Sequence, residues 1–192
     1  MSEPGTSDAD RFLALVKPIE QDLENYCRRL VWEPQEAPDA LQNAVLRGFA
    51  AFDRYREGAS FRAWMFQIVT REALAINRKR VRLARHEFQL EPEELEQLAA
   101  GDPPRLNGAA PISEAELDKV LEPALTAGLR TLTDTERAVL LLRAIGELRY
   151  REISDTLGIP LGSVMGNLAR ARQKMRLLLG RCHPGTKLRK EN

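Results

Sequence analysis

Residues 150–175 predict two helices that meet at a tight turn; they read YREISDTLGIPLGSVMGNLARARQKM. The shorter helix ends at about Leu157, and Gly158, Ile159 and Pro160 form the break. The longer helix begins near Leu161 and carries an apolar stripe at helical spacing: Val164, Leu168, Ala171, Met175 and Leu178. A glycine in the turn permits a conformation that sets the second helix across the first, as in a helix-turn-helix. A purely structural helical hairpin has the same turn, so the motif alone leaves both interpretations open.

A third helix precedes this pair and begins with a capping box. Thr133 is placed to cap the helix, and Glu136 is placed to reach back to the backbone amide of Thr133. Apolar residues continue to Ile145, and the helix ends near Gly146. Residues 123–180 therefore predict a small domain of three helices, whose last helix is rich in arginine and lysine. Such a helix can enter the major groove of DNA while its cations contact phosphates.

The N-terminal part of the chain, residues 9–86, also predicts amphipathic helices. The first carries apolar residues at helical spacing, namely Phe12, Leu15, Ile19, Leu23, Tyr26 and Leu30. The second begins near Pro38 and is expected to bury Leu41, Val45, Phe49 and Phe52. The third follows Ser60, which is able to cap it, and carries Phe61, Trp64, Met65, Ile68, Val69 and Leu74.

A run of cations ends that third helix, with Arg71 two turns earlier: Arg78, Lys79, Arg80, Arg82 and Arg85. Cations at a helix C-terminus complement the helix dipole, and a solvated helix end is the simpler interpretation; the alternative is that they hold phosphates. The aromatic residues nearby are expected mainly in the core, although Tyr55 and Phe61 flank a loop and are able to reach an unstacked base.

Charge is strongly segregated along the chain, although its formal net charge is only +1. Residues 1–86 carry 14 basic and 12 acidic groups, residues 87–122 carry 2 and 10, and residues 123–192 carry 13 and 6. The acidic stretch also contains Gly-Asp-Pro-Pro at 101–104 and Asn-Gly at 107–108, which interrupt helices. It is predicted to be a flexible linker between two modules.

Composition excludes several classes of protein. A chain of 192 residues with 43% hydrophobic, 30% charged and 6% aromatic residues predicts a helix-rich protein rather than a β-sandwich. No apolar run approaches the roughly 20 residues that span a bilayer, so we expect no membrane insertion and a cytoplasmic location. Two isolated cysteines, Cys27 and Cys182, form neither a disulfide framework nor a zinc motif. No catalytic constellation or phosphate-binding loop is present, which predicts a protein that is not an enzyme and uses no metal and no cofactor.

Two separate stretches resemble the bacterial sigma factors of the extracytoplasmic-function (ECF) type, in the sigma-70 family. Residues 37–49 are similar to the region-two helix that docks on the clamp helices of the polymerase β′ subunit. The resemblance implies that the core polymerase is bound by Asp39, Gln42, Asn43 and Arg47, where Asn43 replaces a usual Glu. Residues 52–64 resemble the loop and aromatic helix associated with opening and reading the minus-ten promoter element. The implied contacts to that DNA are Arg54, Tyr55, Phe61, Trp64, Arg71, Arg78, Lys79 and Arg80.

The C-terminal stretch, over residues 132–143 and 150–172, is similar to region four of the same family, which reads the minus-thirty-five element and sits on the β-subunit flap. The contacts implied there are Arg151, Ser163, Asn167, Arg170, Arg172 and Lys174. Two departures predict altered readout. Gly166 and Asn167 stand where the family often has Ser-Arg, and Arg71 and Ala75 stand where Asn and Asp are frequent.

The sequence as a whole predicts an all-α protein with two small helical domains. They are region two at 9–86 and a region-four helix-turn-helix at 123–180, joined by the acidic linker at 87–122 and followed by a basic tail at 181–192. The resemblance implies a specificity subunit whose partners are core RNA polymerase, promoter DNA and an anti-sigma factor. Two other hypotheses remain: a stand-alone helix-turn-helix regulator, and a sigma mimic that binds an anti-sigma protein. The linker is either a polyanion that threads the polymerase channel or a solvated spacer.

Overall fold

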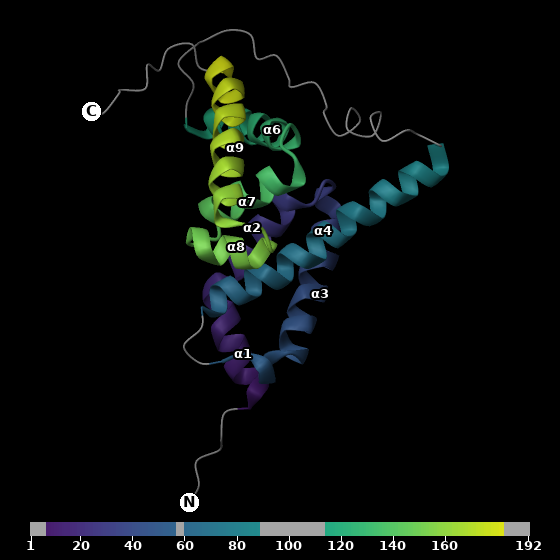
Figure 1. Ribbon diagram of the computed structural model, residues 1–192, viewed down its shortest axis with the longest axis vertical. Helices are drawn as coiled ribbons and strands as arrows, with labels where there is room; N and C mark the ends of the chain where they lie inside the picture. Colours follow the sequence, from purple (N-terminus) through teal and green to yellow (C-terminus); the bar gives the residue numbers. More distant parts are fainter. Residues whose placement is uncertain (1–6, 57–59, 89–113, 183–192) are drawn as a thin grey trace, which may run out of the picture.

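A computed structural model describes residues 7–56, 60–88 and 114–182, and within them every regular element is helical. The N-terminal module contains α1 (Asp8–Val16), α2 (Glu20–Leu30), α3 (Ala37–Ala50) and α4 (Phe61–Phe88), with short 3-10 turns at Lys17–Ile19, Pro34–Glu36 and Phe52–Arg54. The C-terminal module contains α6 (Glu114–Arg130), α7 (Asp134–Ala144), α8 (Tyr150–Leu157) and α9 (Leu161–Cys182) (Figure 1). The all-α prediction is confirmed.

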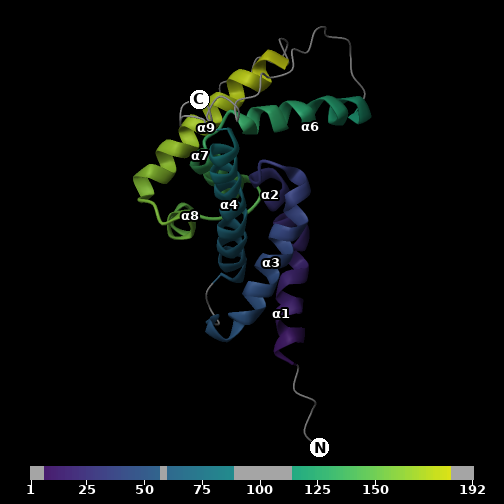
Figure 2. The ribbon, with the colours of Figure 1, turned by 90° about the vertical axis from the view of Figure 1, so that its right-hand side faces the viewer.

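Helix α4 is the central element of the molecule. It lies between α2 and α3 on one side and the C-terminal module on the other (Figure 2). Its inner face carries buried residues at every fourth position, namely Phe61, Met65, Val69 and Ala73. The opposite face, which includes Arg71 and Arg78, is exposed. The helix therefore presents a basic surface from a well-packed support.

Small residues bring α3 close to α4. The buried face of α3 consists of Ala37, Ala40, Ala44 and Gly48. A Cβ atom on Gly48 would lie 2.9 Å from Sδ of Met65, so any larger residue would require the Met65 side chain to shift. Of the four residues predicted to be buried here, Phe52 is buried at 8% exposed, and Leu41 and Val45 are half-buried against the core. The prediction is wrong for Phe49, which is 45% exposed. Close packing of the two helix backbones, which excludes larger side chains from the seam, outweighs the burial of the larger residues.

The segment after α2 is tied to α4 by a buried amide. Asn77 donates from Nδ2 to the carbonyl oxygen of Leu30 (3.2 Å) and accepts at Oδ1 from the backbone N–H of Trp32 (3.1 Å). The Asn77 side chain thus supplies hydrogen-bond partners for the carbonyl group of Leu30, at the end of α2, and for the N–H group of Trp32, which lies just beyond that end. This contact holds Trp32 at the edge of the N-terminal module, where it meets the C-terminal one.

The C-terminal module follows the sequence prediction closely. Thr133 and Glu136 form the expected capping box at the start of α7. Gly158 has a φ of 65°, a left-handed conformation that favours glycine, and it ends α8. The apolar stripe of α9 is buried as expected, at Val164, Leu168, Ala171 and Met175. The turn and the stripe together produce the helix-turn-helix geometry.

Helix α6 begins before the predicted end of the linker. The linker is predicted to end at residue 122, whereas α6 begins at Glu114 and contains Pro123. A proline inside a helix costs about 3 kcal/mol, but α6 packs on α9 and buries Ala124 and Leu129. The remaining predicted linker residues, 89–113, and the tail residues 183–192 lie outside the described part of the chain.

Candidate functional site

The outer face of α3 carries the four residues that the sequence assigned to polymerase binding. Asp39, Gln42, Asn43 and Arg47 are all exposed, and Arg47 pairs with Glu72 of α4 at 3.2 Å. Beside them, between α2 and α3, lies an apolar groove of about 430 Å³. Its lining includes Glu24, Arg28, Leu41, Gln42, Val45 and Leu46.

Two apolar residues on this face were not predicted to belong to it. Leu46 is 59% exposed and Phe49 is 45% exposed, both on α3. Large apolar side chains at such exposure mark a surface that can be covered by a partner. Phe49 was predicted to be buried because the alanines were not recognised as the packing face, and no role was predicted for Leu46.

An aromatic cluster connects α1, the turn after α3 and the start of α4. Tyr55 stacks on Phe52 with an interplanar angle of 6°, and the ring centroids of Tyr55 and Trp64 lie 5.5 Å apart. Phe61 is only 8% exposed and lies 5.3 Å from Tyr55. Tyr55 and Trp64 are half-buried, so these two rings offer a surface, while Phe61 supports them from the core. Residues 57–59 of the predicted DNA-binding loop lie outside the described part.

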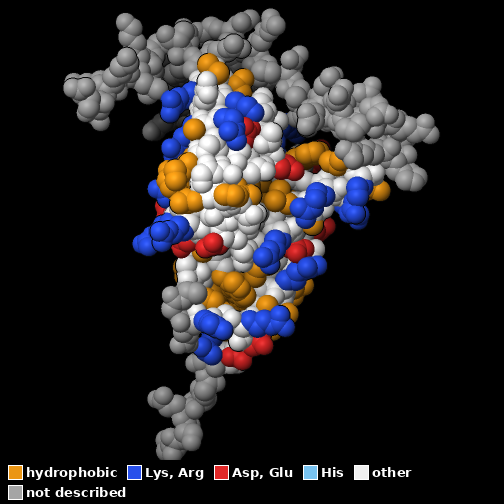
Figure 3. Space-filling view, viewed as in Figure 1, with side chains coloured by type: hydrophobic (Ala, Val, Ile, Leu, Met, Phe, Trp, Pro, Cys, Tyr) orange, Lys and Arg blue, Asp and Glu red, His pale blue; other side chains and the backbone are white. Residues whose placement is uncertain are grey.

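The predicted phosphate-binding cations of the N-terminal module fall into two groups. Arg54, Arg71, Arg78 and Lys79 are exposed, and Lys and Arg side chains are visible along α4 in Figure 3. Trp64, Arg71 and Arg78 follow one another at seven-residue spacing and therefore lie on one side of the helix. Arg80 differs, because its guanidinium pairs with Glu33 at 3.6 Å and with Glu36 at 3.3 Å.

The start of α9 is the exposed edge of the helix-turn-helix. Ser163, Arg170 and Arg172 are exposed, as is Arg151 on α8. Asn167 is less available, because its Nδ2 donates to the carbonyl oxygen of Ser163 (2.8 Å) and its Oδ1 accepts from Arg170 (2.9 Å). The exposed side chains of Leu161 and Met165 extend this edge.

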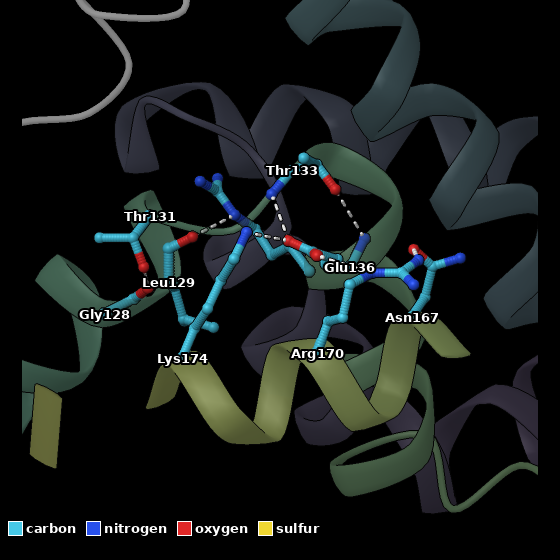
Figure 4. A network of polar contacts seen from close by, with 9 residues as sticks. Gly128, Leu129, Thr131, Thr133, Glu136, Asn167, Arg170 and Lys174 are labelled. Atoms are coloured by element: carbon cyan, nitrogen blue, oxygen red, sulfur yellow. Dashed lines mark hydrogen bonds and ion pairs between the residues drawn. The ribbon is translucent and has the colours of Figure 1, made fainter. Parts of the chain in front are cut away.

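A buried carboxylate links this recognition helix to α7. Glu136 is 3% exposed, and it receives Lys174 Nζ at 2.7 Å and Arg170 Nε at 3.4 Å (Figure 4). The backbone N–H of Thr133 also donates to Glu136 Oε2, at 3.1 Å. Burial opposes ionisation of Glu136, but the hydrogen bonds from Lys174 and Thr133 outweigh it and lower the pKa of the carboxyl. Lys174 and Arg170, both predicted as DNA contacts, thus hold α9 on α7.

Several polar contacts join the two modules, and none of them was predicted from the sequence. Arg62 Nε donates to the carbonyl oxygen of Gly146 (2.6 Å), and its Nη2 donates to that of Ile145 (2.7 Å). Trp32 Nε1 donates to Asp134 Oδ1 at 2.9 Å. These pairs are far apart in the sequence and follow no periodic pattern, so nothing in the sequence signalled them.

Neither a metal-binding cluster nor a membrane-spanning helix is found in the described residues. No group of three or more His, Cys, Asp or Glu side chains is placed to hold a metal ion there. Among the helices of that part of the chain, none is both long enough and apolar enough to cross a bilayer.

Comparison with protein families gives two matches in the order that the sequence predicts. Residues 15–83 match the family model described as sigma-70 region 2, and residues 124–175 match that described as sigma-70 region 4. The two matches together cover more than half of the chain. The matched ranges contain α2 to most of α4, and α7 to most of α9.

Similar curated proteins carry the corresponding names. The ECF RNA polymerase sigma factor SigW of Bacillus subtilis is 27% identical over 169 residues, which cover 88% of this chain and 89% of SigW. The ECF RNA polymerase sigma factor SigE of Mycolicibacterium smegmatis is 31% identical over 148 residues, which cover 77% of this chain. The aligned part is only 53% of SigE, so the chain spans about half the length of that relative.

Two solved structures share the fold. The sigma factor RpoE, in complex with the anti-sigma factor NepR from Bartonella quintana, has a TM-score of 0.67 and is 21% identical, with 90% of this chain and 96% of RpoE covered. The structure of CnrH in complex with the cytosolic domain of CnrY has a TM-score of 0.60 at 23% identity, with 88% and 86% covered.

Proposed function

Since this chain belongs to the sigma-70 family, in its ECF group, we propose that it directs core RNA polymerase to promoters and assists in opening them. The observation that carries the proposal is the presence of both family modules on one chain, each with its functional face exposed. The α3 face and the first turns of α9 lie in different modules. Neither a regulator nor a partner-binding mimic requires both faces.

The α3 face is proposed to bind the clamp helices of the polymerase β′ subunit. Polar residues, Asp39, Gln42, Asn43 and Arg47, border an apolar groove that includes Leu46. An apolar centre with a polar rim is the usual composition of a protein interface. Leu46 is expected to contribute to the affinity, because its exposed apolar side chain would be removed from water on binding.

The aromatic cluster and the α4 cations are proposed to hold the melted minus-ten strand. Tyr55 and Trp64 offer ring faces on which an unstacked base can rest, while Arg71, Arg78 and Lys79 contact the phosphates. Stacking contributes about 1–3 kcal/mol per base, which offsets the few kcal/mol needed to unpair it. Phe61 acts as a support, since it is buried beneath Tyr55.

The helix-turn-helix is proposed to read the minus-thirty-five element and to sit on the β flap. Ser163 is exposed in the first turn of α9, where it can face the major groove, and Arg151 and Arg172 are exposed and can contact phosphates. Arg170 and Lys174 contribute mainly by fixing the recognition helix on Glu136. The protein is proposed to perform no catalysis of its own and to act in the cytoplasm, where polymerase and DNA are found. An anti-sigma protein is proposed as a further partner of this chain. This proposal is supported by RpoE, which shares the fold of this chain and was solved in complex with an anti-sigma factor.

The decisive test adds the purified chain to core RNA polymerase and a library of genomic promoters, and maps the transcript starts. Promoter-specific starts that need the chain are expected. A stand-alone regulator would instead bind a palindromic duplex without polymerase, and a mimic would give no specific starts. L46E should weaken core binding at least ten-fold, whereas L13E is a matched control on α1, because Leu13 is 58% and Leu46 is 59% exposed.

A further inference from the structure

A small cavity lies beside the end of α2, α6 and the start of α7, and we propose that it binds a phosphate group. Its volume is about 50 Å³. Four of the side chains that line it are arginines, namely Arg28, Arg29, Arg130 and Arg137, and Glu122 is the only acidic residue among its described lining residues. None of Arg29, Arg130 and Arg137 is assigned to promoter DNA or to polymerase, so the site does not rest on the proposed function.

The size of the cavity suits one tetrahedral oxyanion. A buried water molecule needs about 10–15 Å³ of such space, so the cavity has room for about three or four water molecules. A phosphate group presents four oxygen atoms to its surroundings and needs a similar space. The cavity is also partly open to solvent, so a phosphate group can enter it and a larger molecule that carries one can extend outwards.

Arg137 is the most deeply buried cation of the cavity, being only 3% exposed. Its Nε donates to the carbonyl oxygen of Leu129 at 2.9 Å. In the described part of the chain, its two terminal nitrogens have no hydrogen-bond or ion-pair partner. They are not among the fully enclosed polar atoms without a partner, so they are open to the cavity. A buried cation without an ion pair is costly, and an anion in the cavity would offset that cost.

Arg28 and Arg29 share one carboxylate. Arg29 Nη2 pairs with Glu122 at 2.9 Å, and Arg28 Nη2 approaches the same side chain at 3.4 Å. The Nε of Arg29 is fully buried and has no hydrogen-bond partner. Glu122 therefore compensates these two guanidinium groups only in part, and it competes with any anion that enters the cavity.

Helix α6 supplies two further donors on one face. Thr126 and Arg130 are four residues apart, so they lie one turn apart on the same side of the helix. Both are exposed, and neither has a hydrogen bond or an ion pair within the described residues. Burial lowers the pKa of the Arg137 guanidinium, Asp134 opposes this effect, and the positive charge of Arg130 lowers the pKa further. Arg130 and Arg137 are therefore close enough to repel each other, and an anion would offset the repulsion.

The negative groups near the cavity are outweighed by the arginines. The last carbonyl groups of α6 carry about half an elementary charge in total, and that of Leu129 is already bound by Arg137. The carboxylate of Asp134 accepts from Trp32 Nε1 at 2.9 Å. Four guanidinium groups thus face two carboxylates and one helix end, which leaves the cavity positive.

A phosphate group suits these donors better than a carboxylate does. Arginine binds an oxyanion through two parallel N–H bonds, and it is a common residue for recognising phosphate. The two guanidinium groups without an ion pair come from different helices, Arg130 from α6 and Arg137 from α7. The oxygens of a tetrahedral anion point in four directions, so it can accept from both, whereas a carboxylate has two oxygens in one plane. The phosphate group is either inorganic phosphate or part of a nucleotide.

The test measures anion binding to the full-length chain. The chain has two tryptophans, and Trp32 lines the cavity, so the variant W64F gives a fluorescence signal from Trp32 alone. Inorganic phosphate and ATP are titrated separately at constant ionic strength, with chloride as the reference anion. Titration calorimetry of the parent protein checks the same constants. Phosphate should give a saturable change with a Kd of about 1 mM or lower, and chloride should give none. A Kd for ATP at least about ten-fold below that for phosphate would identify a nucleotide as the source, and similar values would identify inorganic phosphate.

Two variants should weaken binding and one should strengthen it. R130Q and R137K should each raise the Kd about ten-fold or more, since each removes hydrogen bonds from a charged donor. R137K keeps the charge and a donor for Leu129 but lacks the forked pair of N–H groups. E122Q should lower the Kd, because it removes the competing carboxylate from Arg28 and Arg29.

Two controls separate this cavity from the other basic surfaces. R176Q changes an exposed arginine of α9 outside the cavity, and R78Q changes one of the proposed DNA contacts on α4. Both should leave the Kd unchanged. Absence of saturable binding by the parent, with circular dichroism showing intact helices, would overturn the site. Equal weakening by R130Q, R176Q and R78Q would place the anion on the exposed basic surfaces and would also overturn it, as would a higher Kd in E122Q.

Discussion

Lys174 Nζ lies 2.7 Å from Oε2 of Glu136, whose side chain is 4% exposed. This contact assigns a structural role to a cation that the sequence marked for DNA. The same carboxylate accepts the N–H of Thr133 and pairs with Arg170, so it connects the start of α7 with the middle of α9. A residue outside the helix-turn-helix thus helps to hold the recognition helix in place.

Replacement of Glu136 should therefore destabilise the protein. E136A removes the acceptor for the Thr133 N–H and frees α9, and we expect a loss of about 2 kcal/mol in the free energy of unfolding. Urea denaturation followed by circular dichroism measures it. T135A, at an exposed position in the same turn, should change the free energy by less than about 0.5 kcal/mol. Equal effects of the two variants would contradict the role of Glu136.

The same carboxylate should make stability depend on pH. The pKa of Glu136 is lowered from its ordinary value of 4.5, so the unfolded chain binds its proton more readily than the folded chain. Its contribution is present above that value and is lost as pH falls through the lower, folded pKa. The melting temperature of the parent protein should fall more steeply than that of E136Q between about pH 5 and pH 3. Parallel curves would show that Glu136 does not contribute.

Neutralising neighbouring cations on α4 should affect different properties of the protein, namely promoter binding or thermal stability. R78Q and K79Q should each flatten the dependence of promoter binding on the logarithm of salt concentration by roughly 0.7–0.9 per lost phosphate contact. R80Q should instead lower the thermal stability, because Arg80 pairs with Glu33 and Glu36. Salt titrations of promoter binding and thermal melts of all three variants provide the comparison. An unchanged slope in R78Q and K79Q would remove them from the DNA interface.

Gly146 should tolerate no side chain. A Cβ atom there would lie 2.6 Å from the carbonyl oxygen of Leu142, which is backbone and cannot move aside. We expect G146A to cost about 1–3 kcal/mol of stability, by analogy with overpacked sites. G162A is a suitable control, since nothing lies within 4 Å of a Cβ atom at Gly162. Thermal melts that rank the two variants equally would contradict this expectation.

Features that arise within one helix could be predicted from the sequence, whereas contacts between distant segments could not. The capping box at Thr133 and the buried stripe from Val164 to Met175 were predicted correctly, because both arise within one helix. The buried face of α3 was not predicted correctly, because it consists of small residues. These residues bury less apolar area but let the backbones of α3 and α4 approach closely. Arg62 was also missed. Its partners Ile145 and Gly146 lie more than 80 positions away, and only the tertiary fold brings them together.

The two-ended attachment of α7 has a consequence for cooperativity. Trp32 donates to the Asp134 side chain in the first turn of α7, and Arg62 donates to the carbonyl groups of Ile145 and Gly146 just beyond its last turn. Unfolding of the N-terminal module therefore removes contacts at both ends of this helix. Calorimetry of the parent protein should therefore show a single transition whose calorimetric and van't Hoff enthalpies agree. The double variant W32F/R62M should split it into two overlapping transitions. A split transition already in the parent would mean that the modules melt independently.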